Sequence, residues 1–140
     1  MDTKLIFLPA LAMAALTFVV WCRLYVVRIG EMHRQRIHPQ ALASAAQVAA
    51  RLSDSRASDN FRNLFELPVL FYLALVVAAL TAQATTTVLA LAWLFVALRV
   101  AHSVIHCGYN RVMHRFVVYI AGALVLWAMW AVIAAGWWNA

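Results

Sequence analysis

The stretch LPVLFYLALVVAALTAQATTTVLALAWLFVAL, from Leu67 to Leu98, contains 32 residues and no charge. A helix needs about 20 apolar residues to cross a hydrocarbon core of roughly 30 Å, so this stretch is too long for one span. The polar run from Thr81 to Thr87 divides it. The sequence therefore predicts two membrane-spanning helices joined by a short turn, over about 60–81 and 87–106.

Two further apolar runs flank this pair. The run from Leu5 to Cys22 predicts a first span over about 5–27. The run from Phe116 to Trp138 is also uncharged and predicts a fourth span over 116–138. It ends in two tryptophans, which are typical of the membrane interface.

The composition agrees with this reading. The 140 residues are 66% hydrophobic and 11% charged, whereas soluble domains contain about 25% charged residues. We therefore expect a single all-α integral membrane domain, a transmembrane bundle of four helices. This excludes a soluble globular protein, a disordered chain and a nucleic-acid-binding module.

The cations predict the orientation. The segments 28–59 and 107–115, with the residues next to them, carry eight arginines, whereas the opposite side carries only Lys4. Under the positive-inside rule both segments face the cytoplasm and both termini face away. The eight arginines are Arg28, Arg34, Arg36, Arg51, Arg56, Arg62, Arg111 and Arg115.

The first cytoplasmic segment contains local helix signals. Pro39–Leu52 is rich in Ala, Leu and Gln and predicts a short surface helix. Ser58 or Asp59 is expected to cap the second span. Two cysteines without zinc-type spacing predict neither a disulfide framework nor a metal site.

The second span opens with a polar cluster. Asn63 and Glu66 are three residues apart, on one face of a helix, and Arg62 can pair with Glu66. Pro68 leaves the carbonyl of Leu64 without its usual donor. The alternative is an Arg–Glu pair that only braces the helix end.

The third span ends with a polar stripe. Arg99, His102 and His106 recur at i, i+3 and i+7, and ionisable residues in a span are functional candidates. Tyr119 follows Arg115 by four residues on the fourth helix. A lone His on such a face is more often a helix contact than a ligand. The converging groups nevertheless predict a pocket for a small polyanion with an amine, open to a lipophilic partner in the membrane.

At these residues the sequence resembles the MAPEG family, the membrane-associated proteins in eicosanoid and glutathione metabolism. The resemblance rests on four spans, a basic first loop and two motif regions. The motifs are Arg62-Asn63-x-x-Glu66, then Arg99-Val100-Ala101-His102-Ser103-Val104 with Gly108, and then Arg115 and Tyr119. His106 stands where the family often has Tyr, and Phe116 where the prostaglandin-synthase branch has Ser.

The resemblance implies a homotrimer that binds glutathione, or a related thiol, as cosubstrate between protomers near the cytoplasmic side. It implies that Arg115 lies beside the thiol and that an arginine of the first loop contributes, for which Arg34 is the first candidate and Arg36 the second. We add Arg99 to the binding residues and His106 to the catalytic ones. The remaining implied binding residues are Arg62, Asn63, Glu66, His102 and Tyr119.

The first functional hypothesis is therefore a glutathione-dependent transferase or peroxidase acting on lipophilic electrophiles. It would work in a bacterial inner membrane. A guanidinium beside the sulfur favours the thiolate, which is the nucleophile. Three alternatives remain open: a small proton-coupled multidrug transporter that uses Glu66, a haem or metal protein that uses His102 and His106, and a non-catalytic member that binds a lipid or a partner.

Overall fold

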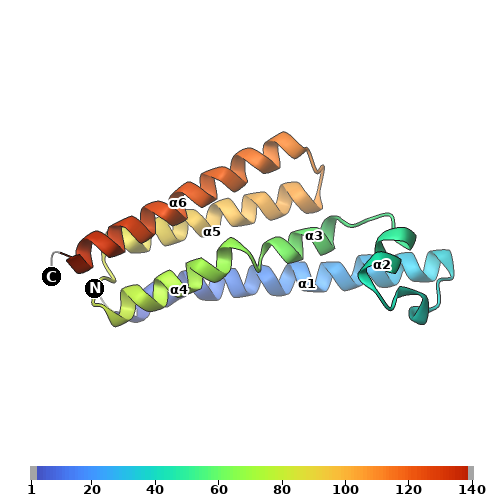
Figure 1. Ribbon diagram of the computed structural model, residues 1–140, viewed down its shortest axis with the longest axis horizontal. Coiled ribbons are helices and arrows are strands. Elements are labelled where there is room, and N and C mark those ends of the chain that lie inside the picture. The colour runs from blue at the N-terminus through green and yellow to red at the C-terminus, as the bar shows by residue number, and fades with distance from the viewer. Residues whose placement is uncertain (1–2, 139–140) are drawn as a thin grey trace.

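The computed structural model describes residues 3–138, and it contains helices and turns but no strand in that range. Four stretches of helix are long and apolar enough to cross a membrane, which confirms the predicted all-α fold with four spans (Figure 1). The elements are η1 (Thr3–Phe7), α1 (Leu8–Gln35), η2 (Pro39–Leu42), α2 (Ala45–Arg51), α3 (Arg56–Asn63), α4 (Leu67–Leu80), α5 (Thr86–Cys107) and α6 (Val112–Trp138).

Helix α1 continues to Gln35, well past the end predicted at 27. Its C-terminal part extends beyond the other long helices (Figure 1). The apolar run marks where a helix leaves lipid, but it does not mark where the helix ends. The end comes at Arg36, which adopts a left-handed conformation with φ 53°. The amide of Ile37 then donates to the carbonyl of Met32 at 3.0 Å and caps the helix.

The second span is not one helix. Helix α3 ends at Asn63 and α4 begins at Leu67, with three residues of turn between them. Pro68 lies in the first turn of α4, where its missing N–H removes no helical hydrogen bond. The proline thus starts a new helix, and the break falls where the Leu64 carbonyl was predicted to lose its donor.

The predicted cap was wrong. Helix α3 begins at Arg56 with Ser55 as its N-cap residue, so Ser58 and Asp59 lie inside the first turn. The hydroxyl of Ser58 instead donates back to the carbonyl of Ser55 at 3.1 Å.

The segment before α3 folds back along α1. As predicted, Pro39–Leu52 contains a short helix, α2, which opens with a capping box between Ser44 and Gln47. Buried Glu31 of α1 accepts hydrogen bonds from the amide and the hydroxyl of Ser53, at 2.8 and 2.7 Å. This carboxylate ties the end of the segment to the extension of α1.

Helices α5 and α6 follow the predicted bounds closely, except that α6 starts four residues early, at Val112. The hydroxyl of Thr85 caps α5 by accepting from the amide of Val88. Phe71 of α4 stacks on Phe95 of α5, with ring centroids 4.6 Å apart, at the centre of the core.

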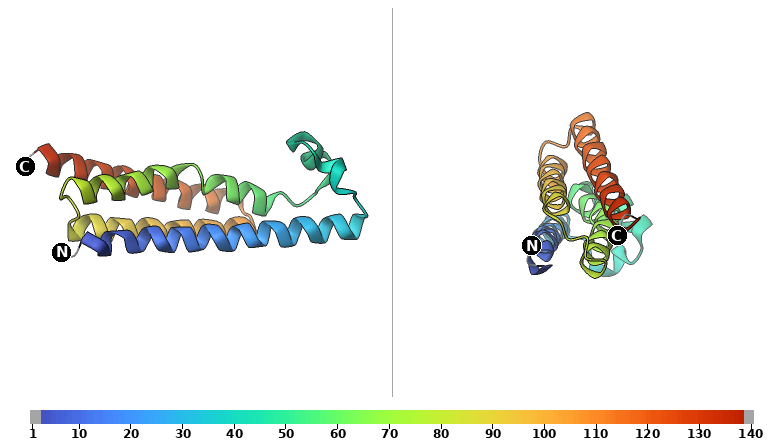
Figure 2. Two further views of the ribbon diagram at one scale, coloured as in Figure 1. Left: turned by 90° about the horizontal axis from the view of Figure 1, so that it is seen from below. Right: turned by 90° about the vertical axis from the view of Figure 1, so that its left-hand side faces the viewer.

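Most of the outer surface of the bundle is apolar, with many large hydrophobic side chains exposed on all four long helices. This surface suits contact with lipid or with other membrane helices. The two ends of the bundle differ. Helix η1 and the last turns of α6 lie at one end, and the α1 extension and α2 lie at the other (Figures 1 and 2). The predicted site residues occupy the half toward that second end.

Candidate functional site

The polar stripe of α5 is buried. Arg99, His102 and His106 are 1%, 2% and 3% exposed. They continue an apolar stripe that begins with Val88, Ala92 and Phe95 at the same alternating spacing. Because the stripe faces the other helices, the three polar groups lie inside the bundle rather than toward lipid.

The guanidinium of Arg99 has no hydrogen-bond partner for either Nη atom within residues 3–138. It lies between two aromatic rings, 4.9 Å from the centroid of Tyr119 and 5.4 Å from that of Phe95. Gly122 of α6 packs beside it, so the helices approach closely here. Cation–π contact offsets part of the desolvation of the charge, but both Nη groups remain without an acceptor, and Arg99 lines neither of the two cavities described below.

His102 forms the centre of a row of rings. Its centroid is 5.5 Å from that of His106, one turn along α5, and 5.9 Å from that of Tyr119 on α6. The Nδ1 of His106 in turn lies 3.5 Å from the Nδ2 of Asn63 on α3. The row therefore connects α6, α5 and α3 through the predicted site residues.

The break between α3 and α4 places Asn63 and Glu66 at two adjoining cavities, of about 280 and 240 Å³. Both residues line both cavities, and so does Arg115 of α6. The cavities together are lined by seven of the nine predicted site residues, namely Arg62, Asn63, Glu66, His102, His106, Arg115 and Tyr119.

The predicted pair between Arg62 and Glu66 does not form among the described residues. Glu66 has left the helix of Arg62 and serves as the N-cap residue of α4, with backbone angles outside the helical region. The proline-induced break thus removes the i, i+4 geometry. It leaves the exposed carboxylate of Glu66 and the exposed guanidinium of Arg62 free at the cavity.

Arg34 lies apart from these residues. It is exposed in the last turn of α1 and lines neither cavity. Within one chain it therefore does not join the other eight.

A residue that sequence reasoning missed holds Arg115. The Nη1 of Arg115 donates to the Oδ1 of Asn110 at 2.8 Å. Asn110 has a left-handed conformation with φ 49°, and its amide donates to the carbonyl of Ile105 at the end of α5. Asn tolerates this conformation better than most residues. The sequence signal that could have predicted this turn is an Asn just after the end of a helix.

A second missed group joins α3 to α5. Asn60 is fully buried, and its Oδ1 accepts from the hydroxyl of Ser103 at 3.3 Å. Its Nδ2 donates to the Sγ of Cys107 at 3.5 Å. These contacts fix the last turn of α3 immediately before the break, and so they set where Asn63 and Glu66 lie.

The cavities combine three kinds of group. Arg62 and Arg115 are cationic, Glu66 and Asp59 are anionic, and Asn63 and the histidines can donate or accept. A ligand with separate carboxylates and an ammonium group matches this mixture. No group of three or more His, Cys, Asp or Glu able to hold a metal ion is present in the part of the chain that the structure describes.

Comparison with known proteins gives one match. The model of the MAPEG family matches residues 6–135. Neither a curated protein nor a solved structure matches the chain.

Proposed function

The chain belongs to the MAPEG family, and we propose that it is a membrane-bound glutathione-dependent transferase or peroxidase acting on lipophilic electrophiles. The observation that carries this proposal is the convergence of three helices on two cavities. There Arg115, fixed by Asn110, stands opposite the unpaired carboxylate of Glu66. Such a site is suited to a small thiol peptide with charged ends.

In this proposal Arg115 stabilises the thiolate. A free thiol has a pKa of about 8.5, so only a small part is ionised at neutral pH. The guanidinium is held by Asn110 at the wall shared by both cavities. A positive charge fixed in this way lowers the thiol pKa without reorganising during the reaction.

The other residues bind the peptide. Glu66 is the carboxylate for its ammonium group, and Arg62 is the cation for a carboxylate at the cavity rim. Asn63, His102 and Tyr119 donate or accept along the walls. The two free Nη groups of Arg99 lie behind Tyr119 and draw negative charge inward.

His106 assists at the sulfur. It is buried, lines the cavity that also contains Arg115, and contacts Asn63. An imidazole there can accept the thiol proton as the thiolate forms.

The chemistry follows from the thiolate. In transfer, the sulfur bonds to an electrophilic carbon and the leaving group departs with its electron pair. In peroxide reduction, the sulfur attacks one peroxide oxygen, the O–O bond breaks, and the alkoxide leaves and takes up the proton that His106 accepted from the thiol. A second glutathione then converts the sulfenic acid to the disulfide and water.

We propose that the protein assembles as a homotrimer. In one chain Arg34 is exposed and lines neither of the two cavities. An exposed arginine on the α1 extension can instead reach the site of a neighbour. The exposed apolar faces of α1 and α6 supply surface for such packing.

We also propose that the site faces the cytoplasm of a bacterial inner membrane, with both termini on the opposite side. The arginines of the segments 28–59 and 107–115 support this orientation. The end of α5 and the start of α6, which line one of the cavities, lie in the same half of the bundle as these segments (Figure 1).

Calorimetric titration of glutathione into the purified protein in detergent tests the proposal, together with ultraviolet absorbance of the thiolate over a pH series. We expect binding, and a thiolate signal that appears at lower pH than for free glutathione. The control variant is Arg51→Ala, which should bind glutathione as the wild type does, because Arg51 is exposed on α2 and lines neither cavity. Absence of both binding heat and a shifted thiolate signal would overturn the proposal.

A further inference from the structure

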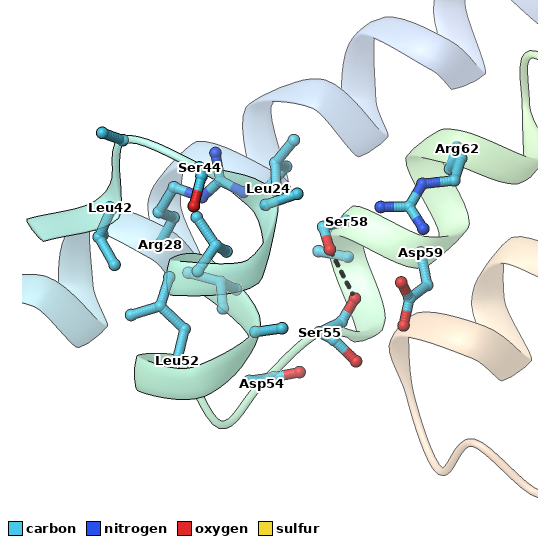
Figure 3. A pocket seen from close by; sticks show the side chains of 16 residues that line it. Leu24, Arg28, Leu42, Ser44, Leu52, Asp54, Ser55, Ser58, Asp59 and Arg62 are labelled. Carbon is cyan, nitrogen blue, oxygen red and sulfur yellow. Dashed lines mark hydrogen bonds between the residues drawn. The ribbon is translucent and has the colours of Figure 1, made fainter.

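A third cavity, of about 520 Å³, is lined by none of the polar stripe residues of α5; Figure 3 shows its lining. It is enclosed by α1, by α3 and by the segment that contains η2 and α2. Its volume is in the range of small-molecule sites, about 300–1,000 Å³.

One side of this cavity is apolar. Leu24 and Val27 of α1 face Leu42, Val48 and Leu52 of the folded-back segment. Alanines of α2 and α3 complete this wall. An unbranched hydrocarbon chain can therefore bury its apolar surface between α1 and the folded-back segment.

Two arginines and two aspartates line the cavity, and Arg56 lies just outside it. The carboxylate of Asp54 is already bound to Arg56, with Nη2–Oδ2 and Nε–Oδ1 distances of 2.7 and 2.9 Å. Asp59 and Arg62 are three residues apart on α3 and offset each other. Arg28 remains, and its guanidinium makes no hydrogen bond or ion pair within residues 3–138.

The cavity lies at the expected depth of the membrane interface. Nη2 of Arg23 donates to the carbonyl of Cys107, the last residue of α5, at 2.8 Å. Leu24 and Val27 therefore follow the level at which α5 ends, and Arg28 comes one turn after Leu24. A ligand can place its chain toward lipid and its polar group toward Arg28.

We propose that this cavity binds a single-chain amphiphile with an anionic head group, a long-chain fatty acid anion. Arg28 binds the carboxylate, and the acyl chain lies along Leu24, Val27 and Val48. The cavity borders the larger of the two cavities of the candidate thiol site, because Asp59 and Arg62 line both. The proposal rests on the cavity alone and is independent of any thiol chemistry.

The test uses the full-length protein in phosphatidylcholine nanodiscs, without glutathione, and radiolabelled oleate as the probe. Bound oleate is measured by equilibrium dialysis and corrected with empty nanodiscs. We expect saturable binding of one oleate per protomer. Oleyl alcohol, which has the same chain but no charge, should bind at least about tenfold more weakly.

Two variants locate the binding. Arg28→Gln should weaken oleate binding at least about tenfold, whereas Arg28→Lys should retain most of it. Ala49→Phe fills the cavity without changing a charge and should abolish saturable binding. Arg51→Gln removes an exposed arginine of α2 outside the cavity and should have no effect.

Melting curves from circular dichroism verify that each variant is folded. Saturable binding that is equal in folded Arg28→Gln and wild-type protein would overturn the proposal. Unchanged binding in folded Ala49→Phe, or no saturable binding to the wild type, would do so as well.

Discussion

The Nη1 of Arg115 is bound to the Oδ1 of Asn110 at 2.8 Å, across the start of α6. The acceptor belongs to the tight turn after α5, and the donor lines both cavities of the candidate site. The turn therefore determines the direction of the guanidinium that we assign to the thiolate. Asn110, which lines neither cavity, therefore acts by positioning Arg115.

Replacing Asn110 by Gly should remove the side chain that binds Arg115 while keeping the backbone conformation of the turn. Gly adopts the left-handed conformation without strain, so the melting temperature should stay near that of the wild type. The amide acceptor is lost, however, and turnover with glutathione should fall about tenfold as the thiol pKa rises. Rates and thiolate absorbance measured over a pH series test this.

Asn110→Asp is the matched variant, since it keeps an acceptor for Arg115. It should retain the position of the guanidinium but neutralise part of its field, so the thiol pKa should rise while glutathione still binds. A pKa of bound glutathione in Asn110→Gly equal to that in the wild-type protein would contradict the positioning role.

Arg115→Ala should lower turnover far more than affinity. The interaction with sulfur is strongest once charge has developed, so we expect about a 100-fold loss in kcat and only a small change in glutathione binding. Steady-state kinetics and calorimetry measure the two quantities separately. Equal loss of both would show that Arg115 only binds the peptide.

Arg99→Met should show opposite effects with and without ligand. In the free protein the guanidinium is 1% exposed and its Nη atoms are unpaired, so an apolar side chain of similar length should raise stability by about 1 kcal/mol or more. Glutathione, in contrast, should no longer raise the melting temperature as it does in the wild type.

Thermal melts at several glutathione concentrations provide this comparison, with Arg99→Lys as the variant that keeps the charge. A fall in stability of ligand-free Arg99→Met would show that the ring contacts with Phe95 and Tyr119 outweigh desolvation.

The stripe of Arg99, His102 and His106 could be predicted because one helix determines it. Its spacing follows helical geometry, and no other element is needed to place the three side chains on one face. The four spans could be predicted equally well from the sequence, since their length and lack of charge reflect the thickness and polarity of the bilayer.

Contacts that depend on a helix end or on two helices could not be predicted in this way. The Arg62–Glu66 pair assumed an unbroken helix, and Pro68 opens one instead. Asn60 is an ordinary polar residue in the sequence, and only the packing of α3 on α5 gives it Ser103 as a partner. The position of the segment before α3 likewise depends on Glu31 binding Ser53, 22 residues away.

The folded-back segment should loosen in acid. Arg56 holds the pKa of Asp54 below its usual value through a side-chain hydrogen bond, and Nη1 of Arg56 also donates to the carbonyl of Gly108, just after α5. Because the folded pKa is lowered, this stabilisation is present above the unfolded pKa and is lost as pH falls through the folded value. Local stability should therefore decrease below about pH 4.

Hydrogen exchange of residues 36–55, corrected for the intrinsic pH dependence, measures the effect. Asp54→Asn should exchange faster at neutral pH and show a smaller acid-dependent step, because only the bonds of the Glu31 carboxylate to Ser53 then remain to be lost. Arg56→Gln should give the same two changes. An acid step of the same size in Asp54→Asn would assign it to another group.

Asn60→Ala should disturb the site from a distance. The substitution leaves the hydroxyl of buried Ser103 without its acceptor, which costs about 1–3 kcal/mol of stability. The last turn of α3 also loses its fixed position against α5, so affinity for glutathione should fall although Asn60 lines neither of the two smaller cavities.

A double-mutant cycle with Ser103→Ala isolates the contact. If the Asn60–Ser103 hydrogen bond carries the effect, the double variant should be more stable than the sum of the two single losses predicts, because no unpaired hydroxyl remains. Additive losses would mean that Asn60 acts through its packing or through Cys107. The Cys107→Ala variant of each protein would then separate these two contributions.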